Sequence, residues 1–322
     1  MGGTTTAEEL LARAAQGDRL ALARLVSLVE RGGGEARAVS RAAFPRAGHA
    51  YTVGIAGPPG VGKSTLTDGL IAHIRAGGGE VGVLAVDPTS PSSGGALLGD
   101  RVRMQRHATD PGVFIRSMAT RGHAGGLAQA VPEAIRVLDA VGLPVVLVET
   151  IGVGQVEVEV AGAADTTMVV VNPGSGDSVQ ANKAGLYEVA DLFVVNKADR
   201  PGVEETRRDL ELMLDLSALG RWRPPILATV ASSGQGVEEV WAEVGRHRAL
   251  LEERSGTSSL LDERRRARLE EELRRLVARQ LEQRAADLFA GLGVAEAREA
   301  LAARRVDPYE AADELLDALG GR

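Results

Sequence analysis

The stretch GIAGPPGVGKSTL, residues 54–66, decides the fold because it fits the phosphate-binding pattern G-x-x-x-x-G-K-[ST]. Glycines keep side chains away from a triphosphate, so that backbone N–H groups surround it, and a lysine adds positive charge. We predict that Lys63 reaches the β- and γ-phosphates and that the Ser64 hydroxyl binds Mg²⁺. The predicted nucleotide-binding residues of this loop are Gly57, Pro58, Pro59, Gly60, Val61, Gly62, Lys63, Ser64 and Thr65.

The flanking sequence supplies the order of strand, loop and helix that this loop requires. The run YTVGIAG before it is apolar and β-branched, and STLTDGLIAHIRA after it places Leu66, Leu70 and Ile74 at helical spacing. Further apolar runs follow, most of them continuous, as in parallel strands covered on both faces. They are VGVLAVD, GVFIRSM, PVVLVET, TTMVVVN, DLFVVNK and PPILATV. We predict an α/β P-loop NTPase with a central, mostly parallel sheet of about seven strands flanked by helices.

The run DLFVVNKAD ends in N-K-x-D, which indicates that the bound base is guanine. A carboxylate at Asp199 accepts hydrogen bonds from N1–H and the 2-amino group of guanine, a pair of donors that adenine lacks. Lys197 would lie over the base, and Asn196 completes the pattern. After the next strand, Val230 and Ala231 stand where GTPases have a Ser-Ala turn whose backbone binds the guanine oxygen, although this match is partial.

The run PVVLVETIGVG supplies an acidic residue, Glu149, followed by Gly152 at the spacing that senses the γ-phosphate. Glu149 with Asp87 and Asp100 would form the carboxylate shell around Mg²⁺ and its waters, beside the Ser64 hydroxyl. Asp87 also fits a helix cap, and Asp100 fits the start of a capped helix. The predicted catalytic residues are Lys63, Asp87, Glu149 and Gly152, and the predicted metal ligands are Ser64, Asp87, Asp100 and Glu149.

The residue that would orient the attacking water is missing from its usual place. Ras-like enzymes carry a glutamine just after the sensing glycine, but this position is Val153, and the nearest glutamine is Gln155. We therefore expect slow intrinsic GTP hydrolysis that a partner stimulates.

Helical segments precede and follow the α/β region. Thr6 and Glu9 have the spacing of a capping box, and residues 20–34 form an apolar stripe that ends at glycines. We predict an N-terminal helical segment over residues 1–48, a P-loop GTPase domain over 49–250 and a C-terminal helical extension over 251–322. Five leucines of the extension lie among many charges, on a stripe that packs on the core or on a second subunit: Leu269, Leu273, Leu276, Leu281 and Leu288.

Composition restricts the partners and the compartment. The formal charge of -7 and a pI near 5.4 argue against nucleic acid or an anionic membrane as the main partner. The chain has no cysteine, which excludes disulfides and thiolate metal sites. No apolar run approaches the length of a membrane span and no export signal is recognised at the start, so we expect a cytoplasmic protein.

Together the motifs resemble one family, the MeaB/ArgK GTPases, which are methylmalonyl-CoA mutase accessory proteins within the G3E group of P-loop GTPases. The resemblance covers nearly the whole chain. Besides the phosphate loop, it rests on VLAVDPTSPSSGGALLGDRVRM, FIRSMATRGHAGGLA, VVLVETIGVGQVEVEVA and GDSVQANKAGLYEVADLFVVNKAD. The segments VDPTSPSSGGALLGD and ETIGVGQVEVEVA are more specific to this family than the phosphate and guanine motifs are.

The resemblance implies a GTPase that binds GTP or GDP with Mg²⁺ and acts as a chaperone for an adenosylcobalamin-dependent acyl-CoA mutase, first of all methylmalonyl-CoA mutase. GTP binding and hydrolysis would gate cofactor loading and protect the mutase. Residues 174–185 match a loop that couples nucleotide state to the partner, with Asp177, Gln180 and Lys183 as candidates, although the same residues fit a capped helix start. The family resemblance also implies a homodimer formed by the C-terminal helices.

Two other functions fit the sequence less well. A metal-delivery GTPase needs clustered soft or imidazole ligands, whereas this chain has no cysteine and five scattered histidines, of which His123 lies between small residues in a loop. A transport-related kinase needs an acceptor pocket and a base, and the sequence offers no residue for either.

Overall fold

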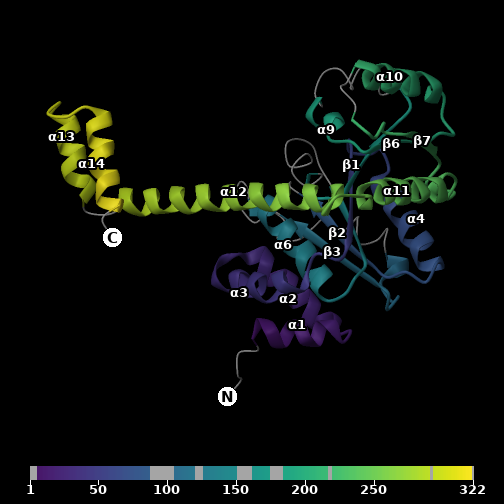
Figure 1. Cartoon of the computed structure of the whole chain (residues 1–322), viewed down its shortest axis with the longest axis horizontal. Helices are drawn as coiled ribbons and strands as arrows, with labels where there is room; N and C mark the ends of the chain where they lie inside the picture. Colours follow the sequence, from purple (N-terminus) through teal and green to yellow (C-terminus); the bar gives the residue numbers. More distant parts are fainter. Residues whose placement is uncertain are drawn as a thin grey trace. The chain divides into compact units, whose positions relative to one another are not determined.

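A computed structural model of the chain describes residues 6–87, 105–119, 126–150, 162–174, 184–216, 220–290 and 293–320. Its centre is a sheet of seven strands in the order β3-β2-β4-β1-β5-β6-β7, with every neighbouring pair parallel (Figure 1). The strands are β1 (Tyr51–Ala56), β2 (Val81–Asp87), β3 (Val113–Ala119), β4 (Val145–Thr150), β5 (Thr166–Val171), β6 (Leu192–Asn196) and β7 (Ile226–Thr229). Each apolar run of the sequence overlaps one strand, and the predicted fold class is confirmed.

Helices cover both faces of the sheet. On one face, α4 (Lys63–Ala76) and α11 (Val237–Glu252) share a buried cluster with the odd-numbered positions Val145 and Leu147 of β4. On the other face, α6 (Gly126–Ala140) packs over the even-numbered positions Val146 and Val148. The helices α9 (Ala184–Glu188) and α10 (Val203–Leu216) cover β5 and β6 on this second face. Because side chains alternate along a strand, Glu149 belongs to the face that α4 covers.

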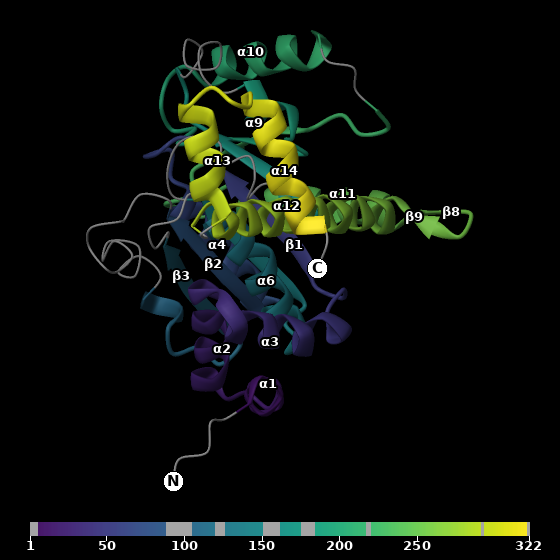
Figure 2. The same cartoon turned by 90° about the vertical axis from the view of Figure 1, so that its left-hand side faces the viewer.

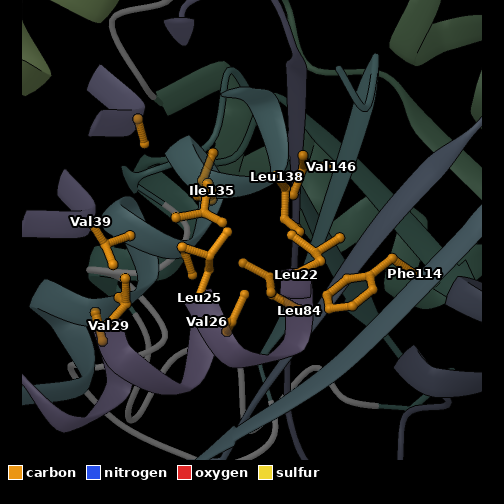
Figure 3. Close-up of a cluster of buried hydrophobic side chains, with 14 of the residues drawn as sticks. Leu22, Leu25, Val26, Val29, Val39, Leu84, Phe114, Ile135, Leu138 and Val146 are labelled. Carbon is orange, nitrogen blue, oxygen red and sulfur yellow. The ribbon is translucent and has the colours of Figure 1, made fainter. Parts of the chain in front are cut away.

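Three helices precede the sheet: α1 (Ala7–Ala15), α2 (Arg19–Arg31) and α3 (Gly33–Ala43), followed by the 3-10 turn η1 (Phe44–Arg46). The predicted capping box is present, with the Thr6 hydroxyl accepting from the Glu9 N–H and the Glu9 carboxylate accepting from the Thr6 N–H. Both views show α1, α2 and α3 gathered beside α6 (Figure 2). Leucines and valines of α2 and α3 enter the same core as Leu84, Phe114 and Leu138 of the sheet and α6 (Figure 3). The N-terminal helices are therefore part of the globular core.

The chain divides into two compact units, residues 1–261 and residues 262–322. The first ends with a two-stranded antiparallel sheet of β8 (Arg254–Ser255) and β9 (Ser258–Ser259), and η2 (Gln105–His107) precedes β3. The helix α12 (Leu260–Ala290) begins at the boundary of the units. In the second unit, α13 (Gly293–Ala302) packs against α14 (Pro308–Gly320), with Val294 and Ala311 buried. The division at residues 48 and 250 expected from the sequence stays a prediction.

Three leucines of the predicted α12 stripe are exposed. Leu269, Leu273 and Leu281 have exposed fractions of 43 %, 61 % and 58 %, while Leu276 is half-buried and the side chain of Leu288 lies outside the described part. Packing of this stripe on the core or on a second subunit stays a prediction. Within the described ranges, no helix is both long and apolar enough to cross a bilayer.

Candidate functional site

The phosphate-binding loop connects the end of β1 to the start of α4. Gly57, Gly60 and Gly62 have φ values of 142°, 79° and 98°. Residues other than glycine rarely adopt such positive values. A Cβ atom on Gly57 would lie 2.1 Å from the Val170 carbonyl oxygen, and one on Gly62 would lie 2.3 Å from Nδ2 of Asn196. The glycines are thus required by backbone conformation and by close packing against β5 and β6.

Lys63, the first residue of α4, extends its side chain into the loop that precedes it. Its Nζ donates hydrogen bonds to the carbonyl oxygens of Gly57 at 2.5 Å and Pro58 at 3.0 Å, and only 6 % of the residue is exposed. Carbonyl dipoles thereby hold the ammonium within the loop. The N-terminal end of α4 adds the positive end of a helix dipole, so this loop is suited to a polyanion.

Ser64 and Glu149 meet at the carboxyl edge of the sheet. The Ser64 hydroxyl donates to Oε1 of Glu149 at 2.5 Å, and Glu149 is 1 % exposed. In the sheet register, Glu149 lies between Ile55 of β1 and Ala85 of β2. A hydroxyl and a carboxylate brought together are the hard oxygen donors that Mg²⁺ prefers, so this part of the predicted metal shell fits the ion.

The remaining predicted metal and switch residues are described only in part. β2 ends at Asp87, at the same edge of the sheet as Glu149, but the side chain of Asp87 lies outside the described residues. Asp100 and Gly152 lie outside them altogether, as do Asp177, Gln180 and Lys183 of the predicted coupling loop. Their roles stay predictions.

Asn196 connects the phosphate loop to the turn that follows β7. Its Nδ2 donates to the Val61 carbonyl at 2.8 Å, while its Oδ1 accepts from the Thr229 hydroxyl at 3.0 Å and from the Ala231 N–H at 3.1 Å. The residue is 2 % exposed. These hydrogen bonds brace the site, and because only one of the two Nδ2 hydrogens is used in them, the predicted nucleotide contact of Asn196 stays a prediction.

Lys197 and Asp199 lie on the loop after β6. Lys197 adopts a left-handed φ of 60°, and its Nζ donates to the Gly60 carbonyl at 2.5 Å. The lysine stem therefore runs from the base-reading loop towards the phosphate loop. Asp199 is exposed, which leaves its carboxylate accessible for the predicted pairing with guanine.

The backbone N–H groups predicted to bind the guanine oxygen lie in the turn after β7 and have partners within the protein. Val230 and Ala231 were expected to bind the guanine oxygen through the backbone, but the Val230 N–H donates to the Gln235 carbonyl and the Ala231 N–H donates to Asn196. Both donors are engaged within the protein. Ser232 carries the next N–H, and within the described ranges Ser232 makes no hydrogen bond. The binding of the guanine oxygen by Val230 and Ala231 stays a prediction.

A pocket of about 430 Å³ adjoins this turn. Thr65 of the phosphate loop and Ala231 and Ser232 of the turn line it, together with Asp68 and Arg106. Two residues predicted to bind nucleotide, Thr65 and Ala231, therefore line this pocket. Nothing in the sequence indicated that Asp68 and Arg106 line this pocket, since neither belongs to a recognised motif.

Two of the histidines considered for metal delivery have partners in the fold. Nδ1 of His247, which is fully buried, lies 2.8 Å from the Thr166 hydroxyl, and Nε2 of His107 lies 3.0 Å from the Asp68 carboxylate. Within the part of the chain that the structure describes, no three His, Asp or Glu residues gather as a metal site would require.

The sequence matches a family model described as "Methylmalonyl Co-A mutase-associated GTPase MeaB" over residues 22–288. The chain belongs to the MeaB family of GTPases. A MeaB-family chain is therefore a guanine-nucleotide-binding protein of the GTP-hydrolase class, in agreement with the P-loop and the N-K-x-D loop described above.

Similar proteins agree with this assignment. A Pyrococcus abyssi protein named as a GTPase is 52 % identical over 323 residues, covering 98 % of this chain and 97 % of its own. The Escherichia coli protein named GTPase ArgK is 38 % identical and covers 73 % of this chain and 74 % of its own. A crystal structure described as a LAO/AO transport system kinase superposes with a TM-score of 0.69 at 26 % identity, covering 99 % of both chains.

Proposed function

We propose that this MeaB-family chain hydrolyses GTP with Mg²⁺ and acts as a chaperone for an adenosylcobalamin-dependent acyl-CoA mutase, methylmalonyl-CoA mutase in the first place. The family description supports the association with a mutase. The observation that carries the nucleotide part is the arrangement of Lys63 in the phosphate loop, with Glu149 beside Ser64 on one side and Asn196 on the other. The gating of cofactor loading follows from the family resemblance.

In the proposed reaction, water attacks the γ-phosphorus of GTP and the bond from the γ-phosphorus to the β–γ bridging oxygen breaks, which releases GDP and phosphate. Lys63 would exchange its two carbonyl partners for phosphate oxygens and stabilise their charge. Ser64 and Glu149 would hold Mg²⁺, whose charge offsets that of the β- and γ-oxygens. Because Val153 replaces the usual glutamine, we propose slow intrinsic turnover that the partner stimulates.

Base recognition would use Asp199 for N1–H and the 2-amino group, and the Ser232 N–H for the guanine oxygen. Asp199→Asn exchanges an acceptor for a donor and should shift preference from guanine towards xanthine nucleotides. Unchanged guanine selectivity in this variant would show that N-K-x-D does not read the base. Lys63→Ala removes the buried ammonium and should abolish tight GTP binding while the protein stays folded.

The deciding experiment is steady-state phosphate release from GTP by the purified chain, alone and with methylmalonyl-CoA mutase from the same source. ATP serves as the control for a kinase-type or non-selective nucleotidase. A slow rate specific for GTP that rises on addition of the mutase supports the whole proposal. A GTP-specific rate that ignores the mutase keeps the GTPase and removes this partner, and other cobalamin enzymes would then be tested in the same way.

We further propose a homodimer that buries the leucine stripe of α12. Leu273→Asp and Leu281→Asp place charges on this stripe, and each should convert a dimer to a monomer in light scattering. Leu20→Asp is the matched control, because Leu20 on α2 is 82 % exposed but lies outside the stripe. A monomeric wild-type chain, or dimers that persist in both stripe variants, would contradict this interface.

A further inference from the structure

The pocket of about 430 Å³ beside the turn after β7 is formed by residues of the first compact unit. One side is a face of α4, whose lining residues recur at the three- and four-residue spacing of a single helix face: Thr65, Asp68, Gly69, Ala72 and His73. The turn residues 231–234, the first two residues of α11 and Arg106 complete the lining. The volume lies in the range of about 300–1,000 Å³ that small-molecule sites have.

This pocket joins residues of two predicted nucleotide motifs. Thr65 follows Ser64 in the first turn of α4, directly after the phosphate loop. The turn that contains Ala231 is hydrogen-bonded to the N-K-x-D motif, because the Ala231 N–H donates to Oδ1 of Asn196 at 3.1 Å. A nucleotide with its phosphates at Lys63 and its base at the N-K-x-D loop has to bridge the same two motifs. The pocket is therefore a candidate for the nucleoside part of the ligand.

Arg106 contributes a planar cation to the lining, and Asp68 holds this cation by its edge. Oδ1 of Asp68 accepts from Nε of Arg106 at 2.7 Å, Oδ2 forms an ion pair with the same guanidinium, and the Asp68 carbonyl oxygen accepts from Nη2 at 3.2 Å. All N–H groups of a guanidinium lie in its plane, so these bonds use none of its two faces. The Asp68 side chain is 16 % exposed and the Arg106 side chain 56 %, so the carboxylate is shielded while the guanidinium is accessible.

The pairing of Arg106 favours contact with a base over contact with a phosphate. The Asp68 carboxylate offsets the positive charge of Arg106 and repels a phosphate that approaches it. Asp68 also lies one helical turn, about 6 Å, beyond Ser64 along α4, away from the phosphate loop. A purine carries no net charge, and the face of a guanidinium stacks on aromatic rings while its edge stays hydrogen-bonded.

We propose that this pocket receives the purine of the bound nucleotide and that Arg106, held by Asp68, stacks on one face of the base. The inference rests on the proposed function, because it needs a guanine nucleotide at the phosphate loop. Lys197 is predicted to lie over the base, so Arg106 supplies the cover of the second face. Stacking does not distinguish one purine from another. In this arrangement Asp199 provides selectivity for guanine, and Arg106 provides affinity.

The test is calorimetric titration of the nucleotide-free chain in Mg²⁺ with GDP and with inorganic pyrophosphate, which carries two phosphates and no base. Arg106→Ala should weaken GDP binding by roughly 3- to 30-fold, the range for loss of a stacked cation, and should leave pyrophosphate binding within about twofold. Arg106→Lys keeps the charge but not the plane, so most of the loss should remain. Arg223→Ala is the matched control, because Arg223 is 52 % exposed and paired with Asp215 but does not line the pocket. It should change neither affinity.

A second pair of ligands separates stacking from reading of the base edge. IDP lacks the 2-amino group of GDP, so Arg106→Ala should weaken both by the same factor and leave their ratio unchanged. Unchanged GDP affinity in Arg106→Ala, an equal loss for pyrophosphate, full retention in Arg106→Lys or an altered ratio of GDP to IDP would each overturn the proposal. A wild-type chain that binds pyrophosphate but no guanine nucleotide would instead contradict the proposed function, and with it this inference.

Discussion

Gly57→Ala is expected to disrupt the phosphate loop far more than the same change at Gly60, although both glycines have positive φ. A Cβ atom at position 57 would lie 2.1 Å from the Val170 carbonyl oxygen and 3.1 Å from the Val170 carbonyl carbon. At position 60 no atom lies within 4 Å of the added Cβ. The two positions therefore share backbone strain but differ in steric overlap.

The size of the effect follows from these two contributions. A positive φ costs a residue other than glycine about 1–2 kcal/mol, which applies at both positions. The overlap at position 57 requires the loop or β5 to move by about 1 Å, and overpacking of this kind costs typically 1–3 kcal/mol more. β5 cannot move easily, because it pairs with β1 on one side and β6 on the other and Val170 is fully buried. We expect a loss of about 2–5 kcal/mol for Gly57→Ala and about 1–2 kcal/mol for Gly60→Ala.

Urea unfolding of the nucleotide-free protein measures this difference without any contribution from phosphate contacts. Trp222 and Trp241, the two tryptophans of the chain, both lie in the first compact unit, so their fluorescence reports the unfolding of the unit that contains the loop. Gly78→Ala, with φ of 77° and no atom within 4 Å of the added Cβ, controls for strain away from the site. Equal stabilities for the variants at positions 57 and 60 would refute the argument from close packing against β5.

Three further predictions concern stability. Asn196→Ala leaves the partners at Val61, Thr229 and Ala231 without their hydrogen bonds and should cost about 2–4 kcal/mol in urea unfolding. Asn196→Asp keeps an acceptor but sets a carboxylate oxygen against the Val61 carbonyl in a buried position, so it should also destabilise the protein, and wild-type stability of either variant would contradict the bracing role. Asp110→Asn should lower the melting temperature at pH 7. Because Arg75 lowers the pKa of Asp110 from its ordinary value of 3.8, the stabilisation exists above that value and is lost as the pH falls through the lower pKa of the folded state, so melting curves of variant and wild type should converge in acid. Asp139→Ala removes the carboxylate that accepts from the N–H groups of Gly48 and Ala50, and the free energy of unfolding should fall by about 2–4 kcal/mol. A decrease below about 1 kcal/mol would indicate that water replaces the carboxylate.

The strands were predictable because a parallel sheet buries both of its faces. β1, β4, β5 and β6 are buried along their whole length, and such strands appear in the sequence as continuous apolar runs that few other structures produce. The phosphate loop was predictable for a related reason. Its glycines are required by local backbone conformation, so the requirement is visible in a few consecutive letters.

The roles of individual polar residues were harder to predict. The N-K-x-D pattern identified Asn196, but only the fold reveals that its amide also bonds Val61 and Ala231. Asp68 and Arg106 gave no signal, because an ion pair between residues on a helix and a distant loop depends on how the chain returns to that helix. Long-range polar contacts have no periodicity that a single sequence can display.

The order of the strands divides the candidate site into a phosphate side and a base side. β1 carries the phosphate loop at the point where the strand order reverses, with β4 on one side and β5 and β6 on the other. The base side is braced by Asn196 and by Lys197, whose ammonium binds the Gly60 carbonyl. GTP and GDP have the same base and differ only at the γ-phosphate, so a rigid base side serves affinity for both. In the proposed mechanism a response to hydrolysis begins where Glu149 meets Ser64 on the side of β4, and the predicted coupling residues 174–185 follow β5 in the sequence.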